Sequence, residues 1–211
     1  MATRYRKCKV CKTRCNVLYG IVNGLDFVCC VDHLIDLGFQ RVEKQKKLEA
    51  KKFKAETRAR KRALKPDSQI MDEAQRSINA YVRERDRGKP CISCNCPEHE
   101  IEVEQGWKPG GAWDAGHFRS RGAAGHLRFN LWNIHRQCKS CNAGSAKYAH
   151  KAETVAVQYE LNLREKVGNR RVDWLKNNNE IRRFNREYCE RIKRIFNRKR
   201  RLLQKRRECI A

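Results

Sequence analysis

Apolar residues recur at the spacing of an α-helix in three separate stretches of the chain. The first begins at Asp67 or Ser68, runs to about Arg87 and places on one face Ile70, Ala74, Ile78 and Tyr81 or Val82. The second covers residues 152–168, with Val155, Tyr159 and Leu163 four apart. The third lies within residues 176–208, where the stripe consists of Ile181, Phe184, Tyr188, Ile192 and Ile195. We expect three amphipathic helices, and the stripes at 70–82 and 181–195 are candidate surfaces for a homodimer.

The segments between these stripes have different compositions. Residues 41–65 carry twelve basic and three acidic residues with no glycine or proline, which predicts a solvated helix that Pro66 ends. Residues 91–150 are rich in Gly, Cys and His, with a short strand expected around Ala112–Phe118 and a helix start near Asn142. We therefore expect an N-terminal zinc-binding module (1–40), a basic helical linker (41–66), a core (67–168) and a basic C-terminal helix or tail (169–211).

Composition limits the class of protein. Of 211 residues 35% are charged and only 8% aromatic, so one large apolar core is excluded. The 49 Lys and Arg against 24 Asp and Glu give a net charge of +25, which indicates a polyanionic partner, because neutralised phosphates release counterions. No long apolar run or signal peptide is present, so we expect a soluble cytoplasmic protein without membrane contact. The candidate DNA contacts are Arg119, Arg121, Arg128, Arg136, Lys139, Arg198, Lys199, Arg200 and Arg201.

Six of the twelve cysteines form C-x-x-C pairs, at residues 8–11, 91–94 and 138–141. Each pair has the spacing of half a structural zinc site, and thiolates that persist together in a reducing cytosol favour metal over disulfides. One expected site combines Cys8 and Cys11 with His33 and either Cys29 or Cys30, between which spacing does not choose. The other expected site, a zinc that holds together the ends of a small subdomain, consists of Cys91, Cys94, Cys138 and Cys141.

The stretch between the two central cysteine pairs offers groups for phosphodiester hydrolysis. That reaction needs a base that activates water, a divalent cation and side chains that hold both in place. His117 is the candidate base, and oxygen donors for Mg²⁺ or Mn²⁺ come from Asp114, Asn133 and Asn142. The alternative is that "WDAGHFRS" is a loop that contacts phosphate without chemistry.

The order of these residues resembles the HNH, or ββα-metal, nucleases. In that family a histidine ends a first strand, an asparagine follows in the turn, and a His or Asn on the next helix binds metal. By this resemblance His117 is the general base, Asn133 orients its loop, and Asp114 and Asn142 bind Mg²⁺. This chain differs from many members of the family at Gly116, because they have an acid or a histidine at that position. The fold implied is α+β: a zinc-stabilised ββα-metal core flanked by long basic helices, with an N-terminal zinc-ribbon-like module.

A narrower resemblance covers residues from about Leu64 to Leu163. The phrases "ALKPDSQIMDEAQRSINAYVRERDRGKPCISC", "WDAGHFRS" and "LRFNLWNIHRQCKSCN" resemble the NinG/Rap proteins of lambdoid bacteriophages. This resemblance implies a metal-dependent endonuclease that cuts branched DNA, including Holliday junctions and D-loops, during phage recombination in the host cytoplasm. Single-strand-containing DNA and recombination proteins are its expected partners. A non-catalytic zinc-ribbon nucleic-acid-binding protein is the alternative; it accounts for charge and cysteines but not for the order of the candidate catalytic residues.

Overall fold

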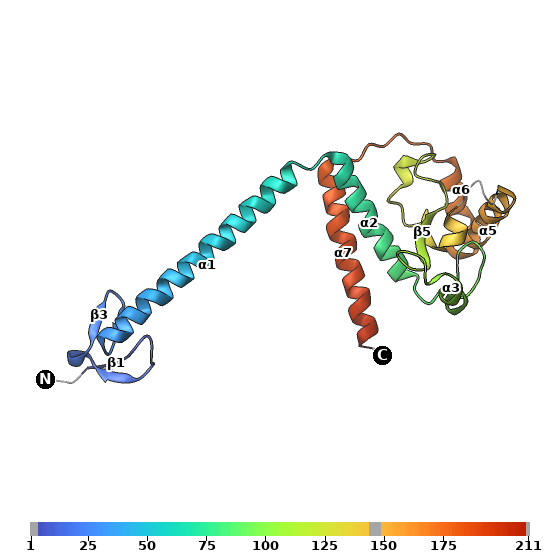
Figure 1. Cartoon of the computed structure of the whole chain (residues 1–211). Coiled ribbons are helices and arrows are strands. Elements are labelled where there is room, and N and C mark those ends of the chain that lie inside the picture. Colours follow the sequence, from blue (N-terminus) through green and yellow to red (C-terminus); the bar gives the residue numbers. More distant parts are fainter. Residues whose placement is uncertain (1–3, 144–148, 210–211) are drawn as a thin grey trace. The chain divides into compact units, whose positions relative to one another are not determined.

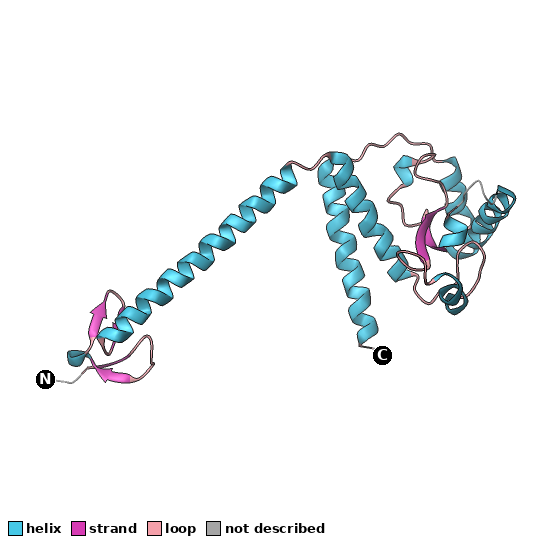
Figure 2. Cartoon of the chain, viewed as in Figure 1, coloured by secondary structure: helices cyan, strands magenta, loops and turns pink. Residues whose placement is uncertain are grey.

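The computed structural model describes residues 4–143 and 149–209, and it combines helices with three small two-stranded sheets (Figure 2). The chain divides into two compact units, Met1–Lys65 and Pro66–Ala211. Within the described residues, no helix has the length and apolar character needed to cross a lipid bilayer. The combination of helices and small sheets confirms the mixed α+β class expected from the sequence.

The first unit begins with two antiparallel hairpins. Strand β1 (Tyr5–Lys7) pairs with β2 (Arg14–Asn16), and after a 3₁₀ turn (Val17–Tyr19) strand β3 (Ile21–Asn23) pairs with β4 (Asp26–Val28). A helix, α1 (Val31–Ala63), follows directly. A small core around Cys8, Val28 and Leu37 joins the hairpins to the first turns of α1.

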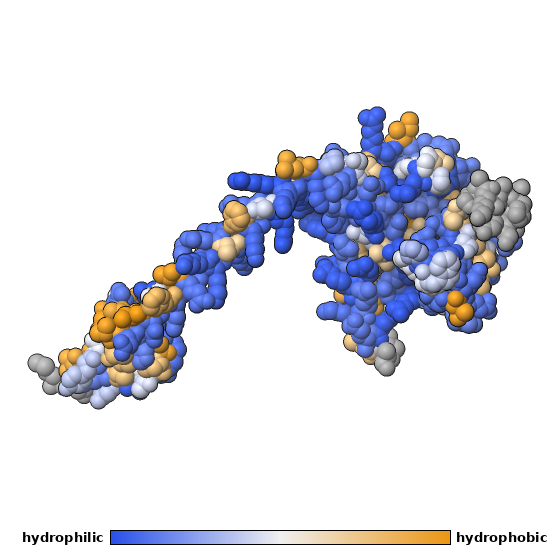
Figure 3. Space-filling view, in the orientation of Figure 1, coloured by the Kyte–Doolittle hydropathy of each residue, from blue (hydrophilic) through white to orange (hydrophobic). Residues whose placement is uncertain are grey.

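Helix α1 extends the expected basic helix toward the N-terminus. It already begins at Val31, so the boundary expected at residue 40 lies inside a continuous helix. The apolar positions Leu34 and Leu37 explain this early start, because they pack on the hairpins. The following turns are mainly exposed and hydrophilic (Figure 3).

Helices α2 (Asp67–Arg85) and α7 (Arg186–Glu208) lie side by side in the second unit (Figure 1). Their apolar faces form one core that contains Ile70, Ala74, Ile78, Val82, Cys189 and Phe196. The two stripes considered as dimer surfaces therefore largely bury each other within one chain. One position of the C-terminal stripe is placed differently: Ile181 is 94% exposed and precedes α7, which starts after Asn185 caps it by accepting a hydrogen bond from the amide of Tyr188 (2.8 Å).

Strands β5 (Trp113–His117) and β6 (Ile134–Cys138) pair antiparallel, with Asp114 opposite Gln137 and His117 opposite Ile134. A 3₁₀ turn (Gly125–Leu127) lies in their connection, and the short helix α4 (Lys139–Asn142) follows β6 directly. Ala115 and Ile134 join the core between α2 and α7. The hairpin and its following helix thus rest on α2.

Three further helices complete this unit: α3 (Glu98–Gln105), α5 (Ala149–Val167) and α6 (Asn169–Asn177). Gly168, at φ +88°, separates α5 from α6. The two helices bury a second core formed by Ile92, Leu127, Tyr159, Leu163, Val172 and Leu175. Residues 169–177, expected to begin a C-terminal tail, are therefore part of the compact unit.

A buried acid ties the end of α2 to β6. Asp86 is 1% exposed, and its carboxylate accepts hydrogen bonds from Arg85 (2.5 Å) and from the backbone amide of Arg136 (3.3 Å). Nζ of Lys166 lies 3.4 Å from Oδ1 of Asp86, and Nδ1 of His135 lies 3.8 Å from its Oδ2. Burial alone would raise the pKa of Asp86, but the neighbouring His135, the hydrogen bonds and charge of Arg85 and the charge of Lys166 outweigh it and hold that pKa well below its usual range. Asp86 therefore stays ionised and fixes β6 against α2.

Candidate functional site

His117 is the last residue of β5, and its ring is partly buried against α2 and the β5–β6 connection. Its Nε2 lies 3.3 Å from the carbonyl oxygen of Arg128, which favours the tautomer with the proton on Nε2 and leaves Nδ1 as an acceptor. Burial, together with the charges of Arg121 and Arg128, outweighs the opposing backbone hydrogen bond and lowers the pKa of His117 to about 4. The imidazole is therefore neutral at physiological pH, the state in which it can accept a proton.

Asn133 holds the loop that follows His117. Its side chain is fully buried; its Oδ1 accepts from the amide of Arg119 (2.8 Å), and its Nδ2 donates to the carbonyls of Arg119 (3.0 Å) and Leu127 (3.3 Å). The side-chain amide of Asn133 thus forms its hydrogen bonds with backbone groups of the protein. Asn133 therefore has the positioning geometry expected from the sequence.

Asp114 and Asn142 meet although 28 positions separate them in sequence. Asn142 Nδ2 donates to Asp114 Oδ2 at 3.0 Å, because the pairing of β5 with β6 brings the start of α4 beside β5. A carboxylate and an amide carbonyl are oxygen donors that Mg²⁺ accepts, and one or two such protein ligands suffice because this ion keeps several waters. The donor set therefore fits a magnesium ion.

Gly116 departs from the acid or histidine of many HNH nucleases because its space is already filled. A Cβ atom at this position would lie 1.9 Å from Oε1 of Gln137, whose side chain donates to Ser93 Oγ (2.7 Å). The carbonyl of Gly116 also accepts a hydrogen bond from the hydroxyl of Tyr159 (3.0 Å). No larger residue fits at 116 without displacing Gln137.

One open cavity of about 370 Å³ brings together three of the four candidate catalytic residues, whereas Asn133 does not line it. Asp114, His117 and Asn142 line it, together with Ser120 and Arg121 from the loop after β5. Arg121 is exposed and is therefore placed to contact a phosphate there.

Helix α2 contributes residues to this site that sequence reasoning missed. Asn79 and Arg83 line the cavity, and Gln75 lies behind His117. The Gln75 amide is fixed at both ends, since Nε2 donates to Asn79 (2.8 Å) and Oε1 accepts from Arg128 (3.2 Å). Their spacing of four along α2 places them on one helical face, but only the packing of α2 on the hairpin brings that face to the site.

Several basic residues expected to contact DNA are engaged inside the protein. Arg119 Nη1 donates to the carbonyls of Leu175 (3.0 Å) and Asn178 (2.6 Å), so it caps the end of α6. Arg136 is 5% exposed, lies 3.6 Å over the ring of Trp113 and pairs with Glu98 at 2.5 Å. Arg119 is occupied inside the protein, and Arg136 is largely buried and borders only a cavity between α2 and α7, which corrects the expectation that both contact DNA from the open surface.

The other basic residues expected to contact DNA differ in their exposure to solvent. Arg128 is half-buried and bonded to Gln75, and Lys139 donates to the carbonyl of Pro109. On α7, Arg198, Lys199 and Arg201 are exposed, whereas Arg200 is half-buried. Arg121 and the exposed positions of α7 therefore remain the accessible candidates.

The four central cysteines converge as the sequence predicts. The sulfur atoms of Cys91, Cys94, Cys138 and Cys141 all lie within 4.8 Å of one another, and tetrahedral zinc with Zn–S bonds of about 2.3 Å requires sulfurs about 3.8 Å apart. Hydrogen bonds among the four thiols lower the pKa of Cys91 and Cys94, and the same hydrogen bonds together with burial raise the pKa of Cys138 and Cys141. This group can hold zinc and would join the loop at 91–94 to the end of β6 and to α4.

The neighbours of this cluster are not part of it. Cys96 lies outside the four-cysteine group, and its Sγ is 3.2 Å from a carboxylate oxygen of Glu100. His99 is 80% exposed.

In the N-terminal module the structure selects between the two open alternatives. The ligand atoms of Cys8, Cys11, Cys29 and His33 all lie within 4.8 Å of one another, with 3.7 Å between the sulfurs of Cys11 and Cys29. Cys30 is near His33 but does not belong to this group and instead precedes the first turn of α1. The second group that can hold zinc therefore uses Cys29.

Comparisons with known proteins agree with the resemblance to a phage family. The family described as "Bacteriophage Lambda NinG protein" matches residues 2–208. "Protein ninG" of Escherichia phage 933W is 34% identical over 205 residues, which cover 92% of this chain and 91% of that protein. "Protein ninG" of Escherichia phage lambda is 40% identical over 140 residues, or 66% of this chain and 60% of that protein, and the Salmonella phage P22 protein is 39% identical over the same shares. No solved structure matches the chain. A match along nearly the whole chain shows that this protein belongs to the NinG family of lambdoid phages.

Proposed function

We propose that this protein is a divalent-metal-dependent endonuclease of the HNH type that cleaves branched DNA, including Holliday junctions and D-loops, in phage homologous recombination. The convergence of Asp114, His117 and Asn142 on one cavity beside Arg121 carries the proposal. A zinc-ribbon protein that only binds nucleic acid would not need a neutral, partly buried histidine beside two oxygen donors.

In this proposal each residue at the site has one task. His117 accepts, at Nδ1, the proton of the water that attacks the phosphorus. Arg121 contacts the phosphate oxygens, and Asn133 keeps the loop after His117 in place. Mg²⁺ or Mn²⁺ held by Asp114 and Asn142 would stabilise the charge that develops on the phosphate and on the leaving oxygen.

The excess positive charge supports a nucleic acid as substrate. With a net charge of +25, the chain would bind DNA mainly through phosphates, with an affinity that falls steeply as salt rises. The same proposal includes branched or single-strand-containing DNA as the substrate and a dimer that cuts two strands. It also includes contact with recombination proteins and action in the host cytoplasm.

A cleavage assay tests the proposal directly. The full chain is incubated with four-way, three-way, D-loop and linear substrates of shared sequence, with Mg²⁺ or with EDTA. We expect Mg²⁺-dependent cleavage that is faster on the branched substrates than on the linear duplex. Binding to all four substrates without cleavage of any would instead support the non-catalytic alternative.

A further inference from the structure

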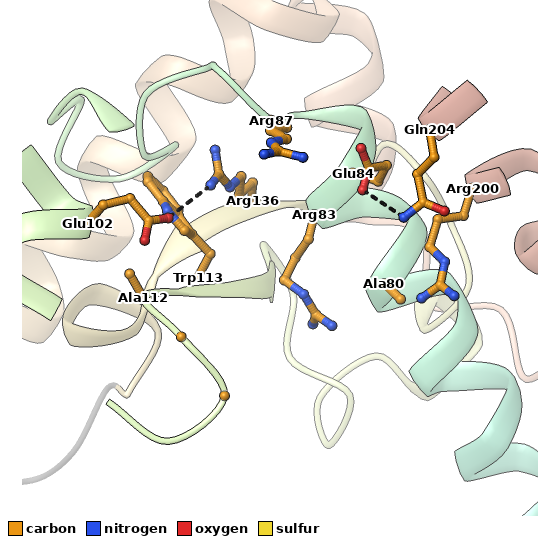
Figure 4. A pocket seen from close by; sticks show the side chains of 12 residues that line it. Ala80, Arg83, Glu84, Arg87, Glu102, Ala112, Trp113, Arg136, Arg200 and Gln204 are labelled. Carbon is orange, nitrogen blue, oxygen red and sulfur yellow. Dashed lines mark hydrogen bonds and ion pairs between the residues drawn. The ribbon is translucent and has the colours of Figure 1, made fainter. Parts of the chain in front are cut away.

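A second cavity, of about 300 Å³, lies between α2, α7 and the loop that leads into β5 (Figure 4). Four arginines from three elements line it: Arg83 and Arg87 at the end of α2, Arg136 on β6 and Arg200 on α7. Such a concentration of guanidinium groups in one concave site is unusual without an anion, because like charges in a partly desolvated space repel one another.

The acidic residues of this cavity do not balance its arginines. Glu84 already accepts hydrogen bonds from Arg207 and from Gln204 (3.4 Å), and Glu102 lies 3.7 Å from Arg136 (Figure 4). In the part of the chain that the structure describes, the side chains of the other three arginines form neither a hydrogen bond nor an ion pair; these are Arg83, Arg87 and Arg200.

Residues that line the cavity also carry buried donors without an acceptor. Among the described residues, the buried side-chain nitrogen or oxygen atoms without a hydrogen-bond partner are Trp113 Nε1, Arg136 Nε and Arg200 Nε. All three belong to residues that line this one cavity. A buried donor without a partner costs stability, so the polar groups packed around this cavity are incompletely satisfied by the protein itself. The excess of positive charge also affects Arg83. Burial and the charges of Arg200 and Arg136 lower the pKa of Arg83, although Asp114 opposes this effect.

We propose that this cavity binds a second phosphate group of the DNA, next to the site of the phosphate that is cleaved. The inference rests on the proposed function, because it takes DNA as the ligand. Trp113 at this cavity and Asp114 at the candidate catalytic cavity are consecutive residues of β5, and Arg83 lines both cavities. Two phosphates of one DNA molecule would thus be held on either side of Arg83, which fixes the strand relative to His117.

The variant Arg200→Gln tests this second site, because Arg200 lines it but not the catalytic cavity. Binding to a four-way junction is measured in EDTA over a range of NaCl concentrations, so that cleavage plays no part. We expect the affinity to fall several-fold and the slope of log affinity against log salt to decrease by about one. Without DNA the melting temperature of the variant should be no lower than that of the parent, because the change removes an uncompensated charge. Arg200→Lys should retain most of the salt slope.

The matched control is Arg206→Gln, which removes the same charge from an exposed position of α7 outside the cavity. If Arg200→Gln changes affinity and slope no more than Arg206→Gln does, the second phosphate site is refuted.

Inorganic phosphate distinguishes a free anion from DNA as the source of the phosphate group. At equal ionic strength, phosphate should raise the melting temperature of the parent more than chloride does, and this difference should disappear in Arg200→Gln. If the phosphate effect depends on Arg200 but junction affinity does not, the cavity holds a free phosphate and the DNA assignment is overturned.

This test is independent of the cleavage assay. If the parent cleaves no DNA but Arg200→Gln selectively loses junction affinity, the second site holds and the proposed nuclease activity fails. If the parent cleaves but Arg200→Gln binds as Arg206→Gln does, the reverse is true.

Discussion

The hydrogen bond between Asp114 and Asn142 places the carboxylate that lines the candidate catalytic cavity beside an amide, and no described residue forms a hydrogen bond with the second oxygen of this carboxylate. Asp114→Asn keeps the size of this side chain but removes its charge. Since Mg²⁺ prefers charged oxygen ligands, we expect cleavage by the variant to be slower and to require more Mg²⁺. Junction affinity in EDTA should be equal or higher, because a negative charge near phosphate is lost.

A Mg²⁺ titration of the cleavage rate measures this effect, with Asp36→Asn as the control at an exposed position of α1. An unchanged Mg²⁺ requirement in Asp114→Asn would remove Asp114 from the metal site.

At the scale of elements, the sequence predicted those helices, strands and metal sites that are marked by the spacing of residues close together in the chain. The stripe from Ile70 to Val82 is a helix face, and the short strand expected around Ala112–Phe118 is β5. The C-x-x-C pairs also identified both cysteine clusters, because two residues between paired cysteines are the usual spacing of half a zinc site.

The remaining elements depend on long-range packing. Helix α3 reads "EHEIEVEQ", in which only Ile101 and Gln105 are buried, so its sequence carries little periodicity. Arg83 reaches the candidate catalytic cavity and Asp86 reaches β6 only because α2 packs on a hairpin about 30–50 residues further along the chain. No local pattern distinguishes Arg136, which is buried, from Arg121, which is exposed, because both belong to basic polar stretches.

The zinc prediction concerns the link between β6, α4 and the loop at residues 91–94. Cys138→Ser removes one ligand of the central group, so we expect zinc per chain to fall from two to one and the melting temperature to decrease. Cleavage should be lost with it, because α4 carries Asn142.

The control is Cys209→Ser, an exposed cysteine outside both groups, which should keep both ions. Full zinc content and full activity in Cys138→Ser would show that these four cysteines are not the ligand set.

At the scale of the whole molecule, the chain combines a large positive charge with one small site that has the groups for hydrolysis. The charge is distributed over both units, whereas Asp114, His117 and Asn142 all belong to the second unit. Binding and cleavage should therefore separate: a change at one neutral residue of the site affects the reaction without a measurable loss of DNA affinity.

His117→Ala measures this separation most directly. Binding in EDTA and cleavage in Mg²⁺ are determined on the same four-way junction for the parent, for His117→Ala and for the control His99→Ala, which changes an exposed histidine. We expect His117→Ala to lose cleavage by a factor of roughly 10²–10⁴, the usual contribution of a general base, and to keep the affinity of the parent. If His117→Ala cleaves the junction as fast as the parent does, His117 is not the base and the nuclease assignment of this site is contradicted.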